Sequence, residues 1–135
     1  MAFETVKQSA DEGSLHLMFV WLDMLEADNV AAAENASRRF PAQSAVQHFH
    51  DPHRRVGSAV ALSMGAPDKV AWDFYLLYSS SLQWKQVAPT PAVWFHQLQD
   101  ESWAGPDHYR WGKALGPSIR QVLADIPRFR NRSGT

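Results

Sequence analysis

The chain has 135 residues, 45% of them hydrophobic, and a formal net charge of −1 at pH 7. This size and composition predict one globular domain and exclude a wholly disordered chain. The near-neutral charge argues against nucleic-acid binding as the main function, because phosphate recognition needs a basic face. The sequence has no cysteine, which excludes disulfides, thiolate catalysis and zinc–cysteine sites.

No apolar run reaches the roughly 18–20 residues that a membrane-spanning helix needs. The N-terminal residues MAFETVKQSADEG are polar and lack the apolar core of a signal peptide. We therefore expect a cytoplasmic protein that does not contact a membrane. A secreted protein whose signal peptide had been removed would look the same.

The apolar run at residues 15–22 predicts a strand that is buried on both faces at the centre of a sheet. An acidic turn follows at residues 23–29, with Asp28 as the expected N-cap of an alanine-rich helix. This helix should end near Phe40, because Pro41 cannot continue it.

Residues 44–50 alternate in polarity and predict a second strand. Asp51 as N-cap and Pro52 at the first helical position predict the start of a second helix, which should end at Gly65. The aromatic and branched residues at 70–78 predict a third strand.

The rest of the chain predicts shorter elements and a closing helix. These are an antiparallel strand at 82–84, a strand or helical turn at 92–98, a short helix at 107–115 and a final helix at 118–126. Residues 127–135 are expected to form a flexible tail.

This order predicts parallel strands joined by right-handed helical crossovers, followed by an antiparallel hairpin and a helix. The expected fold class is α/β, a three-layer α/β/α sandwich around a mixed sheet of about four to five strands. One domain would cover residues 1–126.

The strand and turn around Trp21 resemble the active-site unit of the thioredoxin family, in which a Cys-x-x-Cys motif opens a helix. Leu25 and Asp28 stand roughly where the two cysteines would be. The family's cis-proline corresponds to Ala71-Trp72, which has no proline. The resemblance implies a thioredoxin-like fold. Without a cysteine thiolate it implies no thiol–disulfide exchange.

The acidic loop Asp23–Asp28 would lie at the carboxyl end of the central strand, where parallel sheets usually bind ligands. Asp23, Glu26 and Asp28 can bind a cation there or serve in acid–base catalysis. The alternative is that Asp28 caps the helix and Glu26 interacts with its positive end. Asp73 is a further catalytic candidate, since a carboxylate inside an apolar strand needs a partner.

A histidine cluster gives a candidate metal site. His48 and His50 share one strand face and are spaced to chelate one ion, His53 can add a third ligand, and Asp51 can orient an imidazole. The alternative is an edge strand with incidental histidines. No cofactor is predicted beyond such a divalent metal.

Aromatic residues and prolines gather in the second half of the chain, where they can line a binding surface or pack a loop against the sheet. The candidate surface residues are Trp72, Trp84, Trp94 and His96.

Three functions therefore remain open. The first, and the leading one, is a non-catalytic thioredoxin-like module that binds a protein partner or forms a homodimer. The second is a metal- or small-ligand-binding protein, and the third is an enzyme with carboxylate acid–base catalysis.

Overall fold

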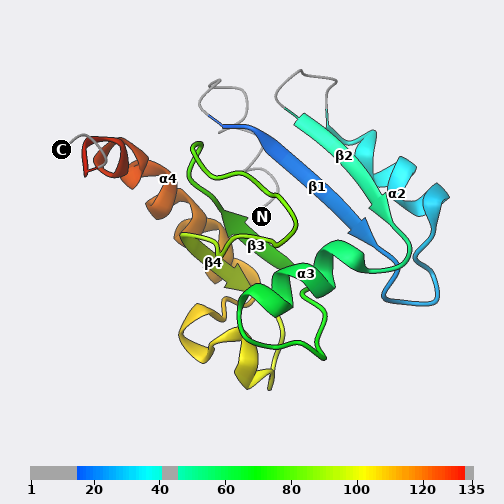
Figure 1. Cartoon of the computed structure of the whole chain (residues 1–135). Helices are drawn as coiled ribbons and strands as arrows, with labels where there is room; N and C mark the ends of the chain where they lie inside the picture. Colours follow the sequence, from blue (N-terminus) through cyan, green and yellow to red (C-terminus); the bar gives the residue numbers. More distant parts are fainter. Residues whose placement is uncertain (1–14, 41–45, 133–135) are drawn as a thin grey trace.

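The structure is a computed structural model that describes residues 15–40 and 46–132, with side chains up to residue 125 (Figure 1). Helices and strands alternate along the first half, and two strands and a long helix follow. The elements are β1 (Leu17–Leu22), α2 (Val30–Ser37), β2 (Val46–Asp51), α3 (Arg55–Ser63), β3 (Phe74–Leu77), β4 (Val93–His96) and α4 (Leu115–Arg132).

The four strands form two separate pairs in the described part of the chain. β1 and β2 are parallel, with Phe19 opposite His48 and Trp21 opposite His50. β3 and β4 are antiparallel, with Phe74 opposite His96. The chain thus combines helices with strands, as expected of an α/β protein. One mixed sheet joining all four strands is not seen among these residues.

The prediction that the first strand is buried on both faces is wrong. Met18 is 66% exposed, whereas Phe19 beside it packs against Phe40, at the turn that follows α2. Successive residues of a strand point to opposite faces. The face of β1 that carries Phe19 is therefore covered, and the face that carries Met18 is open at that end.

Both predicted helix starts are displaced along the chain. The N-cap of α2 is Asn29, whose side chain accepts a hydrogen bond from the Ala32 N–H, and not Asp28. α3 begins at Arg55, after a turn that contains Pro52. The Asp51 carboxylate still serves this helix, because its Oδ2 accepts a hydrogen bond from the Val56 N–H at 2.7 Å.

The end of α3 agrees with the prediction. Gly65 has a φ of 82°, which glycine adopts without the cost that a side chain would add. The Gly65 N–H donates to the Leu62 carbonyl, and the Ala66 N–H donates to the Ala61 carbonyl. These two hydrogen bonds form a Schellman motif, which satisfies carbonyls that the helix leaves unpaired.

The second half differs from the prediction in its boundaries. Asp73 has a φ of 55°, so the extended strand begins only at Phe74. The antiparallel partner of β3 is β4, and residues 82–84 form no strand. Short 3-10 turns replace the helix expected at 107–115, and α4 continues beyond residue 126 to Arg132.

Two clusters of buried side chains flank β3. Val60 and Ala61 of α3 lie in one cluster, against which Phe74 and Leu76 pack. Leu115 and Ile119 of α4 lie in the other with Phe95, and Tyr75 packs against them. Alternate residues of β3 thus contact α3 on one side and α4 on the other, as the period of two in a strand requires.

Candidate functional site

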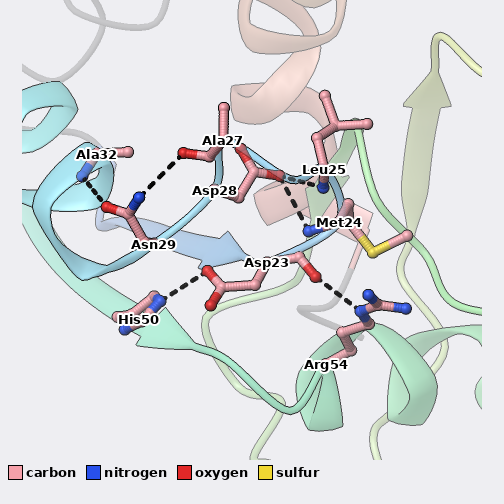
Figure 2. A network of polar contacts seen from close by, with 9 residues as sticks. All are labelled: Asp23, Met24, Leu25, Ala27, Asp28, Asn29, Ala32, His50 and Arg54. Carbon is pink, nitrogen blue, oxygen red and sulfur yellow. Dashed lines mark hydrogen bonds and ion pairs between the residues drawn. The ribbon is translucent and has the colours of Figure 1, made fainter.

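The carboxyl ends of the two parallel strands bring an acid and a base together. Asp23 follows β1, and His50 lies near the end of β2. His50 Nε2 and Asp23 Oδ1 are 2.8 Å apart, and both side chains are partly exposed (Figure 2). A carboxylate at this distance orients the imidazole. This pair joins one residue of the predicted acidic loop to one residue of the predicted histidine cluster.

The loop that carries Asp23 is held by polar contacts with its own backbone and with α3. Asp28 Oδ2 accepts hydrogen bonds from the N–H groups of Met24 and Leu25, at 2.9 and 2.6 Å. Arg54 Nε donates to the Asp23 carbonyl oxygen at 2.7 Å (Figure 2). The carboxylate of Asp28 is therefore engaged in shaping the loop. Arg54 was not among the predicted site residues, and its backbone is left-handed (φ 57°).

The predicted carboxylates do not converge on one point. Glu26 is exposed in the loop, while Asp73 precedes β3. In the described part of the chain no hydrogen bond or ion pair joins Asp73 to Asp23. Partial burial raises the pKa of the Asp73 carboxyl, and the neighbouring His96 lowers it to a smaller extent.

The predicted histidine site is not assembled either. His48 Nδ1 accepts a hydrogen bond from the indole Nε1–H of Trp21 at 3.2 Å, and its ring stacks on Phe19 with 5.0 Å between centroids. The Asp51 carboxylate accepts a hydrogen bond from the Val56 N–H of α3 and from no imidazole among the described residues, while His53 is exposed. Over residues 15–40 and 46–132, no group of three or more His, Asp or Glu side chains is placed to hold a metal ion.

Of the four predicted surface residues, His96 is buried, and Trp72 and Trp94 are partly buried. His96 is 1% exposed, with Nε2 2.8 Å from the Gly105 carbonyl and Nδ1 accepting from the Leu98 N–H. Trp94 is partly buried, donates its indole N–H to the Ala104 carbonyl, and stacks on His108. Trp72 is partly buried too. A buried Trp or His needs a polar partner. Trp94 and His96 find theirs in the loops that follow β4, and these hydrogen bonds hold the loops against the strand.

Trp84 is exposed, and it has exposed apolar neighbours. Leu82, Trp84 and Val87 are 44%, 45% and 68% exposed. All three lie in the connection between β3 and β4, residues 78–92, which we call the β3–β4 loop. Trp84 contacts Tyr78 edge to face, with 6.0 Å between ring centroids. The Tyr78 hydroxyl is buried and has no hydrogen-bond partner among the described residues, and burial raises its pKa.

Leu82 and Val87 were not among the predicted surface residues. The sequence feature that could have indicated a functional loop was the length of the β3–β4 connection together with its prolines. Loops longer than about 12–15 residues without secondary structure are uncommon in compact domains and are usually functional or disordered.

The comparisons with known proteins match nothing: no family model, no curated protein and no solved structure. Within the described ranges, no helix combines the length and the apolar character needed to cross a membrane. The function has to be inferred from the geometry.

Proposed function

We propose that this chain is a binding module that contacts a protein partner through the β3–β4 loop. The observation that carries the proposal is the exposure of Leu82, Trp84 and Val87 within six residues of sequence. A partner that covered these side chains would gain on the order of 1.5–3 kcal/mol for each large one fully buried. Tryptophan is also among the residues that most often dominate binding energy at interfaces.

The β3–β4 pair is a rigid scaffold that holds the β3–β4 loop in position for binding a partner. Both ends of the loop are fixed by the β3–β4 pair, because the Ala92 N–H donates to the Leu77 carbonyl. Trp84 is held against Tyr78 at the end of β3. An aromatic side chain that is already positioned loses little conformational entropy on binding. The loop therefore presents its apolar side chains at a lower entropic cost than a free peptide would.

The fold proposal is a thioredoxin-like domain without redox chemistry, a three-layer α/β/α sandwich around a mixed sheet of about four to five strands. Three observations support it. The elements follow the order β1-α2-β2-α3-β3-β4-α4, with a parallel first pair and an antiparallel second pair. α3 reaches both pairs, since Gly57 approaches Leu22 of β1 while Val60 lies in the cluster that contacts β3. α4 contacts the other face of β3.

A second copy of the chain is the first partner to test. Sedimentation over a concentration series would compare the wild type with Leu82→Ser and Trp84→Ser. We expect the wild type to form a dimer that both substitutions weaken by at least tenfold in Kd. The matched control is Trp111→Ser, because Trp111 is 66% exposed and lies outside the β3–β4 loop. It should leave the dimer unchanged.

If the wild type is monomeric, the partner is a different protein. A photo-cross-linking residue at position 84 in the source cells should then give one discrete adduct that the same residue at position 111 does not give. The purified partner should bind the chain, with Kd raised at least tenfold by Leu82→Ser. The proposal is overturned if the wild type forms no dimer and the residue at position 84 gives no specific adduct.

A further inference from the structure

Two histidines on the same face of β2 make contacts that respond oppositely to protonation. One contact is with β1 and the other is with the residue just after it. Each histidine bonds to the residue two positions after the one that it faces in the strand register. His48 lies opposite Phe19 but bonds to Trp21, and His50 lies opposite Trp21 but bonds to Asp23. The first contact involves an uncharged donor and the second a carboxylate.

The indole N–H of Trp21 can only donate a hydrogen bond. His48 Nδ1 must therefore be the acceptor, which requires a neutral imidazole with its proton on Nε2. A proton added at Nδ1 would remove this acceptor and set two N–H groups against each other. At His50 the same proton would strengthen the contact, because an imidazolium forms a charge-assisted hydrogen bond with the Asp23 carboxylate.

The surroundings of His48 are aromatic. The rings of Phe19 and Trp21 from β1 stack on it, and Phe40, after α2, lies at 5.5 Å with a tilt of 49°. The described charged and titratable groups on the elements packed here are few. They are His16 before β1, Asp23 after β1, His50 and Asp51 on β2, together with Glu34, Arg38 and Arg39 of α2 and its following turn. Asp51 is buried, Asp23 and His50 are partly exposed, and the others are exposed.

We propose that His48 is a proton-sensitive latch between β1 and β2, which releases the Trp21 indole on mild acidification while His50–Asp23 holds the ends of the strands together. Acid thus breaks the His48–Trp21 connection between the two strands and leaves the existing His50–Asp23 contact in place. The Trp21 side chain and the aromatic cluster around it (Phe19, Phe40, His48) become free to rearrange, and the carboxyl end of β1 stays in place.

The direction of titration agrees with this geometry. Burial lowers the pKa of His48 below its ordinary value, so the unfolded chain takes up this proton first as the pH falls. The contribution of neutral His48 to stability is then fully present above about pH 6.5, and it is lost as the pH falls from that value through the lower folded-state pKa.

Nuclear magnetic resonance titration of the full chain tests the latch. The Trp21 indole N–H signal should shift with the same midpoint as the His48 ring, below about pH 6.5. In His48→Gln, whose amide oxygen can accept the indole hydrogen bond without titrating, the Trp21 signal should become independent of pH in this range. His50→Gln is the matched control on the same strand face, and in it the Trp21 shift should remain.

A second variant keeps the test decisive if His48→Gln does not fold. Trp21→Phe removes the donor that favours neutral His48, so the His48 midpoint should rise relative to the wild type. The latch is overturned by a Trp21 signal that titrates in His48→Gln as in the wild type. It is equally overturned by a His48 midpoint that Trp21→Phe leaves unchanged.

Discussion

Asp73 combines two local costs at one position. Its φ of 55° is uncommon for residues other than glycine, although Asn and Asp tolerate it better than most. Although the Asp73 residue is exposed at the surface, partial burial raises the pKa of its carboxyl, and His96 lowers it to a smaller extent, so the folded chain holds this proton more tightly than the unfolded chain. Stability is therefore highest where the carboxyl is protonated in both states, and it falls as the pH rises through the folded-state pKa.

Asp73→Asn should raise the free energy of unfolding at pH 7. Asparagine keeps the left-handed backbone accessible and carries no charge to desolvate. The gain should vanish near pH 2.5, where the carboxyl of Asp73 is protonated in both states. Urea denaturation at the two pH values measures this, with the exposed Asp68→Asn as control. A gain of the same size at both pH values would contradict the explanation.

At the scale of the element, α3 packs through a glycine. A Cβ at Gly57 would lie 2.6 Å from Leu22 Cδ2, 2.7 Å from Val70 Cγ1 and 2.8 Å from the Ala71 carbonyl oxygen. The Ala71 N–H also donates to the Gly57 carbonyl at 2.9 Å. The helix thus approaches the end of β1 and the segment before β3 more closely than a side chain at position 57 would allow.

Gly57→Ala should destabilise the chain by about 1–3 kcal/mol, the usual cost of overpacking, even though alanine favours helices. Two of the three clashes involve branched side chains held in the packing, and the third involves backbone. Chemical denaturation measures the loss. Leu62→Ala, at an exposed position of the same helix, should change stability by less than about 0.5 kcal/mol. A neutral Gly57→Ala would mean that α3 can move away from β1.

For the molecule as a whole, β3 connects the two clusters of buried side chains. Phe74 and Leu76 pack against the α3 cluster, and Tyr75 packs against the α4 cluster. Neither cluster can lose its packing without exposing one face of the same strand. We therefore expect the two clusters to unfold together.

Leu115→Ala should lower the free energy of unfolding by about 2–5 kcal/mol, because Leu115 of α4 is fully buried in one cluster with Phe95 and Ile119. Unfolding should remain a single transition with the same dependence on denaturant. The exposed Arg120→Ala of the same helix is the control. Two separate transitions in the Leu115→Ala protein would show that the clusters are independent.

Much of the local structure follows from the sequence by itself. The periodicity and the turn residues determine the order of strands and helices, and Gly65 determines where α3 ends. The composition excludes thiol chemistry. These features depend on interactions between neighbours in the chain, which the local residue types largely decide.

The cap positions and the site depend on tertiary contacts. Whether Asp28 caps α2 or shapes its own loop is decided by which N–H groups lie nearest in the folded chain. The prediction for His96 was wrong because burial depends on the loops after β4, which carry no periodic signal. The pairing of Asp23 with His50 follows from the parallel register of β1 and β2. The exposure of Trp84 was one of two outcomes left open by the sequence, and only the packing around β3 and β4 decided between a buried ring and a surface one.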